Sequence, residues 1–155
     1  MGKLAWVVLL AGGYWAWQND MIPVPAELAA PSPAWEAYTR FSQYLAHGQY
    51  GNARGMASRA GVRAVQIREL RGRRNTRLGI SGQAASRDDL EWQAKGDLLG
   101  VSHDVISEVA SADGQSVKIE AVQRVCRRQA GCEENEHTVE MCQVGQEWKV
   151  CSFRE

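Results

Sequence analysis

The sequence lacks the short motifs that mark many nucleotide-binding and hydrolytic sites. It contains no glycine-rich phosphate-binding loop and no nucleophile elbow, which argues against a P-loop NTPase and an α/β-hydrolase. Its three histidines, at positions 47, 103 and 137, are too few and too scattered to suggest a metal cluster. We therefore expect no metal and no cofactor, and no motif identifies a reaction or a ligand.

The chain also lacks a long apolar run. The run from Leu4 to Trp17 is shorter than the roughly 20 residues that span a bilayer. No small-x-small cleavage site closes it, because Tyr14, Trp15 and Trp17 stand there instead. Aromatic side chains collect at membrane interfaces, and the following residues extend the run to a workable length. We therefore favour an uncleaved transmembrane anchor over residues 1–21, with these three aromatics at the membrane interface.

Two other interpretations of this run stay open. One is a cleaved signal peptide with an atypical site near Ala29-Ala30, and the other is a buried core helix. Positive charge at Lys3 and the amino terminus indicates a cytoplasmic N-terminus, which leaves residues 20–155 outside the cytoplasm. The predicted localisation is the bacterial inner membrane, with a single span and the remaining domain in the periplasm.

Proline is absent after residue 33, and all four prolines lie between residues 22 and 33. Proline fixes φ and favours extended geometry, so this segment is expected to be a short, semi-rigid spacer. The residues that follow suffice for one hydrophobic core but not comfortably for two. The predicted organisation is an anchor (1–21), a proline-rich spacer (22–33) and one extracytoplasmic domain (34–155).

Cysteine occurs only near the C-terminus, at Cys126, Cys132, Cys142 and Cys151. An even number of clustered cysteines in an exported chain favours two disulfides. A zinc site is a weaker alternative because the tight Cys-x2-4-Cys pair is missing, and free thiols are another. Four cysteines allow three pairings. We prefer the pairing of neighbours, since each neighbouring pair flanks a predicted strand turn.

What the sequence does contain is a readable order of elements. Ser32 and Pro33 suit the start of a helix that runs to His47, and a weaker helix is expected over residues 50–58. Residues 62–71 and 77–81 are ambiguous between helix and strand. The strands that we expect cover residues 90–101, 104–111, 116–125, 137–144 and 147–153.

Helices followed by an antiparallel meander indicate an α+β domain. The full prediction is an N-terminal transmembrane helix, then helices packed on a curved antiparallel sheet. Alternation across the last hairpin places Val139, Met141, Trp148 and Val150 on one face. The same alternation places Cys142, Cys151 and Phe153 on the other.

Three segments of the chain resemble those of a known superfamily. They are the aromatic-rich first helix, the stretch Leu45-Ala-His-Gly-Gln-Tyr50 and the final strand Glu147-Trp-Lys-Val-Cys-Ser-Phe. They resemble the nuclear transport factor 2-like, or ketosteroid-isomerase-like (SnoaL-like), superfamily over roughly residues 34–155. This resemblance implies a cystatin-like cone fold that encloses a conical pocket. Members include isomerases, hydratases, ligand binders and secretion-system assembly subunits, so the fold does not select the function.

An enzyme of that superfamily needs a general base opposite a hydrogen-bond donor in a dry pocket. The candidate bases are Asp88, Asp89, His103 and Asp104, and the candidate donors are Tyr38, Tyr44 and Tyr50. However, Asp88-Asp89 also fits a helix start or loop. His103-Asp104 also fits a solvated strand entry. We lean against an enzyme.

A net charge of zero conceals a strong separation of charge. Between Arg54 and Arg87 nine arginines face the single acid Glu69, whereas residues 88–155 hold fourteen acids and seven Lys or Arg. The arginines either pair with the acidic strands or form a cationic surface for anionic lipid or an acidic partner. The residues expected to make such a surface are Arg68, Arg71, Arg73, Arg74 and Arg77.

These features predict a membrane-anchored, non-catalytic accessory or assembly subunit of a bacterial envelope complex. Its expected partners are the inner membrane and a protein or other acidic surface. Nucleic acid is not expected, because the domain is exported. The alternative is a periplasmic small-molecule-binding or isomerase-type pocket protein of the same fold. The partner's identity and the oligomeric state stay open.

Overall fold

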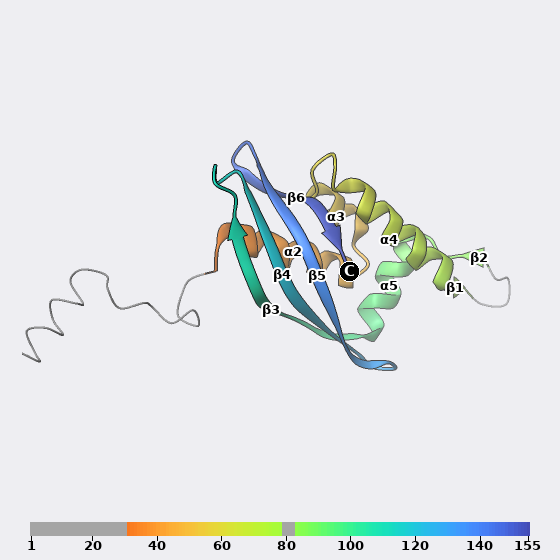
Figure 1. Cartoon of the computed structure of the whole chain (residues 1–155). Helices are drawn as coiled ribbons and strands as arrows, with labels where there is room; N and C mark the ends of the chain where they lie inside the picture. The colour runs from red at the N-terminus through yellow and green to blue at the C-terminus, as the bar shows by residue number, and fades with distance from the viewer. Residues whose placement is uncertain (1–30, 79–82) are drawn as a thin grey trace, which may run out of the picture. The chain divides into compact units, whose positions relative to one another are not determined.

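A computed structural model describes residues 31–78 and 83–155 (Figure 1). In these residues, four helices and two short strands precede a meander of four long strands. In chain order the elements are α2 (Pro33–Ala46), α3 (Tyr50–Gly55), α4 (Val62–Asn75), β1 (Arg77–Leu78), β2 (Gln83–Ala84), α5 (Arg87–Asp97), β3 (Leu98–Ala110), β4 (Ser116–Arg127), β5 (Gly131–Val144) and β6 (Glu147–Arg154).

The first helix begins where the sequence predicts. The Ser32 side chain accepts a hydrogen bond from the Trp35 backbone N–H at 3.0 Å, and Pro33 occupies the first turn. These residues suit their positions because a hydroxyl satisfies a free N–H and proline has none to satisfy. Tyr38, Phe41 and Leu45 then recur at helical spacing and are buried against the sheet.

The four long strands form one antiparallel sheet in the order β3-β4-β5-β6. The turn between β3 and β4 is the predicted one, with Gly114 at a φ of 69° and the Asp113 carboxylate accepting from the Gln115 N–H. Asp-Gly suits this turn because glycine takes a positive φ without steric cost. Tight turns of this kind let each strand pair with the next one in the chain.

One predicted strand is a helix. Residues 90–101 were expected to be a half-buried strand, but residues 87–97 form α5 and β3 begins at Leu98. Leu90 and Ala94, four residues apart, are buried, whereas the intervening Trp92 is 79% exposed. The period is therefore helical, and the capping box of Ser86 and Asp89 fixes the first turn.

The predicted faces of the last hairpin are partly wrong, because β6 contains a bulge. Met141 pairs with Val150 and Glu140 pairs with Ser152, so Cys151 is an extra residue on β6. An inserted residue reverses the alternation that follows it. Phe153 was expected on the face opposite Val150. It packs instead against the core, with its ring centroid 5.4 Å from that of Phe41.

The core lies between the helices and one face of the sheet (Figure 1). Ile119, Val139, Met141 and Val150 from the strands are fully buried there. Residues on the opposite face, such as Lys118 and Glu140, are exposed. The helices and the sheet both contribute side chains to this one core, so residues 32–155 form a single compact unit.

The predicted fold class is wrong as a whole, because it began with a transmembrane helix. Within residues 31–78 and 83–155, no helix has the length and apolar character needed to cross a bilayer. What the structure has is a four-stranded antiparallel sheet with helices. The stretch assigned to the anchor, with Tyr14, Trp15 and Trp17, lies outside the described residues, as does most of the spacer.

Candidate functional site

Glu69, the single acid of the arginine-rich segment, is a structural anchor. Its carboxylate is almost fully buried and accepts from Arg54 at 2.6 Å and from Arg87 at 3.0 and 3.2 Å. The hydrogen bonds to Glu69 raise the pKa of Arg87. One carboxylate thus ties α3, α4 and the start of α5 together. A buried charge needs such partners, since an unpaired one is strongly destabilising.

Two of the five predicted contact arginines are also engaged within the fold. Arg68 forms an ion pair with Glu155 at the C-terminus, and Arg73 donates from Nε to the Ala85 carbonyl at 2.8 Å. Arg77 lies in β1. The five predicted residues therefore do not all serve one binding surface, because Arg68 and Arg73 make contacts within the fold.

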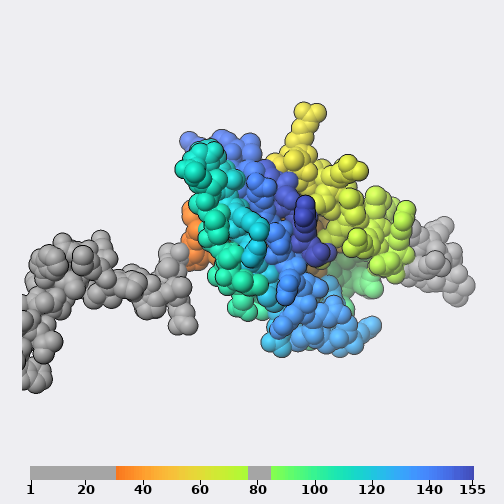
Figure 2. Space-filling view, viewed as in Figure 1, coloured from red at the N-terminus to blue at the C-terminus, as the bar shows by residue number. Residues whose placement is uncertain are grey.

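The outer face of α4 carries three further arginines of this segment. Arg63, Arg71 and Arg74 are exposed there, and none of them forms an ion pair with another described residue. Ile67 and Leu70, between them on the same face, are 50% and 55% exposed. We call these five residues the α4 face. In Figure 2, α4 is the yellow-green surface beside the dark blue C-terminal strand.

The α4 face has the composition of an interaction surface. Residues 63, 67, 70, 71 and 74 follow a spacing of three to four, so they lie on one side of the helix. Apolar side chains at the centre and arginines around them are typical of protein interfaces. Helix-in-groove recognition generally uses anchors at this spacing.

A second cluster lies inside the domain, around Tyr38 and His137. The Tyr38 hydroxyl is 2.8 Å from His137 Nδ1, and His137 Nε2 is 3.6 Å from the Glu155 carboxylate. Burial raises the pKa of Tyr38 to about 12. Burial, with the nearby Arg68 and His103, lowers the pKa of His137 to about 4. At neutral pH both groups are uncharged, and a phenol that donates to Nδ1 leaves the imidazole proton on Nε2.

His103 belongs to this interior cluster, contrary to the expectation of a solvated strand entry. It sits within β3 and packs its ring against Tyr38, with centroids 5.7 Å apart. Burial lowers the pKa of His103. Three atoms in or beside the cluster are buried without a hydrogen-bond partner: His103 Nε2, Gln123 Oε1 and His137 Nε2.

The structure scatters the other candidate catalytic residues. Asp88 and Asp104 are exposed. Ser86 caps α5, and its hydroxyl and backbone N–H donate to the Asp89 carboxylate, which lowers the pKa of that carboxyl. Tyr44 is half-buried at a surface groove, and Tyr50 is buried beside α4. Tyr38 and His103 are the candidate donor and base that the fold brings together.

The interior around Tyr38 is filled rather than hollow. Tyr38, Phe41, Ile119 and Met141 are among the largest fully buried side chains. Trp92 lies on the surface and does not contribute to this interior. Substrate turnover needs space beside the reacting groups. The Tyr38 and His137 pair is thus uncharged at neutral pH and enclosed by packed side chains.

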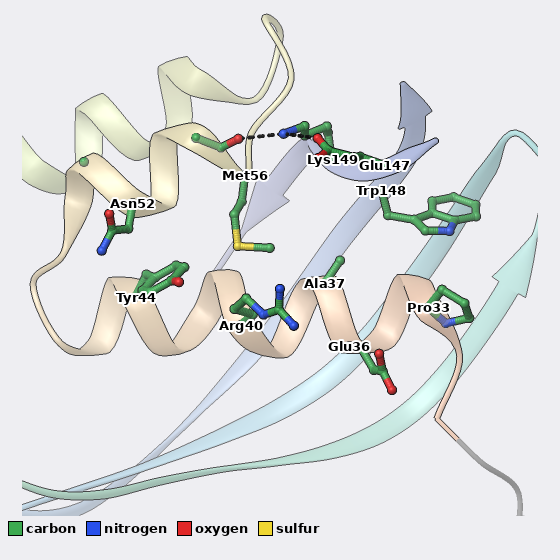
Figure 3. Close-up of a pocket in the computed structure, with 12 residues that line it drawn as sticks. Pro33, Glu36, Ala37, Arg40, Tyr44, Asn52, Met56, Glu147, Trp148 and Lys149 are labelled. Carbon is green, nitrogen blue, oxygen red and sulfur yellow. Dashed lines mark hydrogen bonds and ion pairs between the residues drawn. The ribbon is translucent and has the colours of Figure 1, made fainter. Parts of the chain in front are cut away.

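An open groove with a volume of about 490 Å³ lies between α2, α3 and the start of β6 (Figure 3). Tyr44 and Arg40 from α2 line one wall, Met56 lies deeper, and Trp148 from β6 stands near the other end. Lys149 crosses it to reach the Gly55 carbonyl at 2.8 Å. The groove mixes apolar and charged groups, and Tyr38, His103 and His137 are not in its lining.

Both disulfides join neighbouring cysteines, as preferred from the sequence. Cys126 bonds to Cys132 across the paired strands β4 and β5, and Cys142 bonds to Cys151 across β5 and β6. No free cysteine is present among the residues that the structure describes. No group of three or more possible metal ligands occurs in that part of the chain either.

Comparisons with known proteins add little to this geometry. No protein-family model matches the chain, and no curated protein matches it. A solved structure that is similar is that of a SEC-C motif-containing protein from Rhodopseudomonas palustris. It shares 10% sequence identity, covers 80% of each chain and superposes with a TM-score of 0.48. A likeness this distant carries no argument, and the resemblance to the nuclear transport factor 2-like superfamily stays a prediction.

Sequence reasoning missed three contributors to these clusters: His137, Ile67 and Leu70. A signal for His137 was present, because it alternates with Val139 and Met141 along a predicted strand and so shares their buried face. Ile67 and Leu70 lie in a segment that was ambiguous between helix and strand. Without the helical assignment, their position between arginines on one face could not be derived.

Proposed function

We propose that this domain is a non-catalytic accessory or assembly subunit of a bacterial envelope complex, and that it binds an acidic protein partner through the α4 face. The observation that carries the proposal is the pair of half-exposed residues Ile67 and Leu70 set among exposed arginines. The arginines match carboxylates in charge and geometry. The two apolar side chains contribute apolar area to such a contact.

The two disulfides support a site of action outside the cytoplasm. Structural disulfides persist in oxidising compartments such as the periplasm and are rare in the cytosol.

The alternative function is that of a small-molecule-binding or isomerase-type pocket protein. The buried Tyr38 and His137 pair, with His103 beside it, favours this candidate. The filled interior speaks against it. Partner binding is the better supported of the two, because its surface is already exposed.

The discriminating experiment reverses charge on the α4 face. The double substitution Arg71→Glu and Arg74→Glu should abolish recovery of the partner when the protein is purified from its native cells after chemical cross-linking. Both side chains are exposed, so the melting temperature should change little. Arg73 is unsuitable for this test, since its bond to the Ala85 carbonyl makes it structural.

The matched control is Lys95→Glu with Arg128→Glu, which makes the same change in net charge at two other exposed positions. Lys95 also lies in the last turn of its helix, as Arg74 does. The proposal requires a protein that is recovered with the wild type and the control, and lost with the α4 variant. Equal recovery with all three proteins contradicts it. Binding to anionic vesicles that depends on Arg71 and Arg74 would assign the surface to lipid instead.

A further inference from the structure

A second recess, separate from the α4 face and from the groove on α2, lies where all four helices meet the end of β4. Its volume is about 260 Å³. Leu45 at the end of α2, Leu90 and Ala94 of α5 give it an apolar wall. Arg68 of α4 and Arg127, the last residue of β4, give it two guanidinium groups. Segments far apart in the sequence thus converge on one small polar and apolar site.

Two guanidinium groups and one carboxylate line this recess. Arg68 pairs with Glu155, but Arg127 is half-buried and forms no ion pair among the described residues. Asp97 is the acid in the lining, and its carboxylate accepts instead from the Gln129 backbone N–H at 3.2 Å. The two guanidinium groups outnumber the Asp97 carboxylate in the lining, and like charges that face one recess repel each other.

The electrostatics of Arg68 agree with this geometry. Burial lowers the pKa of its guanidinium, the neighbouring Tyr50 opposes that shift, and the charges of Arg127 and Arg71 add to it. An anion in the recess would relieve the repulsion between Arg68 and Arg127. The site therefore favours a negatively charged occupant.

The recess also depends on a glycine. A Cβ placed on Gly72 of α4 would lie 3.1 Å from the Tyr50 hydroxyl and 3.5 Å from a methyl of Leu90. The absence of a side chain at this position leaves room for the Tyr50 hydroxyl, a hydrogen-bond donor, in the wall of the recess.

We propose that this recess binds a small organic anion, with a carboxylate or phosphate group held by Arg127, Arg68 and the Tyr50 hydroxyl and a short apolar body against Leu45 and Leu90. Guanidinium groups bind both kinds of anion in bidentate fashion. A volume below the roughly 300 to 1,000 Å³ of sites for drug-sized ligands limits the body to a few heavy atoms. Benzoate and phenyl phosphate represent the two head groups.

The test is the melting temperature of the full chain at millimolar concentrations of benzoate or phenyl phosphate, with sodium chloride at matched ionic strength as the reference. A ligand that binds only the folded state raises the melting temperature in proportion to its affinity. We expect a rise of several degrees above the chloride reference. The substitution Arg127→Gln should abolish this rise, and Arg74→Gln on the α4 face should leave it intact.

Two further measurements keep the proposal open to refutation if Arg127→Gln does not fold. Amide chemical shifts of the wild type should move at residues 94–97 and 127 on adding the anion, and not at residues 63–67. Inorganic phosphate should bind more weakly than phenyl phosphate, because it lacks the apolar body. A response no larger than that of chloride, or one that Arg127→Gln retains, overturns the proposal. Loss of the partner in the Arg71 and Arg74 variant has no bearing on this outcome, so the two proposals fail independently.

Discussion

At the scale of single residues, buried polar groups are the notable feature of this domain. Tyr38 and His137 share a hydrogen bond in the core, and Gln123 donates to the Ser42 hydroxyl at 2.7 Å beside them. Buried polar atoms are costly unless they are paired. His137 can avoid the larger cost of a buried charge by staying neutral, and its low pKa expresses that preference.

This low pKa predicts how stability depends on pH. Histidine has a pKa near 6.5 in the unfolded chain, whereas that of His137 is about 4 in the folded domain. Between these values the unfolded state binds the extra proton, so stability rises with pH. We expect the free energy of unfolding to be fully retained above pH 6.5. It should fall by up to about 3 kcal/mol as the pH drops to 4.

Urea unfolding at a series of pH values measures this effect. His137→Gln should flatten the slope between pH 4 and 6.5, because glutamine does not titrate. His47→Gln is the matched control, since His47 is exposed at the end of α2. Some slope should persist in the His137 variant, because burial lowers the pKa of His103 as well. An identical slope in the His47 and His137 variants would show that His137 is not the group responsible.

At the scale of elements, the segment after α3 closes one edge of the sheet. Ser58 donates from its backbone N–H to the Val150 carbonyl at 2.9 Å, and Ala57 forms a parallel bridge with Val150. Gly61 follows and lies against the same carbonyl: a Cβ at this position would be 2.0 Å from the Val150 oxygen. The close approach of this segment to β6 is therefore possible only with glycine.

Gly61→Ala is expected to destabilise the domain by about 1 to 3 kcal/mol, the usual cost of forcing extra atoms into a packed site. The measurement is the midpoint of denaturant unfolding. Gly96→Ala in α5 is the matched control, because a Cβ there meets nothing within 4 Å. It should be neutral or slightly stabilising, since alanine favours a helix over glycine. Equal effects of the two substitutions would argue against the close contact at Val150.

The elements also show where sequence patterns are sufficient. The helix at residues 33–46 and the strands of the C-terminal half follow from capping, periodicity and the Asp-Gly turn. The helix α5 was missed because three residues, Leu90, Trp92 and Ala94, satisfy an alternating pattern and two of them also satisfy a helical one. Only tertiary contacts distinguish the helical period from the strand period, because they bury Leu90 and Ala94 and leave Trp92 exposed.

At the scale of the whole molecule, the disulfides fasten three neighbouring strands of the sheet. They close short loops, with sequence separations of 6 and 9 residues. In the chain-entropy model, loops of this length stabilise a fold by about 2 to 3 kcal/mol each. Because one core serves both layers, loss of these cross-links should weaken the entire domain rather than one edge.

We therefore expect the melting temperature to fall on reduction, and to fall by less in the double variant Cys142→Ser and Cys151→Ser, which retains the other disulfide. Intact mass spectrometry provides the check, because reduction of two disulfides adds about 4 Da. An unchanged mass on reduction would show that the cysteines are not bonded, and an unchanged melting temperature would show that the bonds do not stabilise the fold.

The sequence by itself determined the local features of this protein: the start of α2, the turn at Gly114, the four long strands in outline and the preferred cysteine pairs. Each depends on residues close together in the chain. Tertiary structure alone decided which arginines are free. Arg68 and Arg73 are engaged by Glu155 and the Ala85 carbonyl, whereas Arg71 and Arg74 face solvent beside Leu70. The reason is physical: the partner of a charge is set by packing between elements, which local periodicity does not encode.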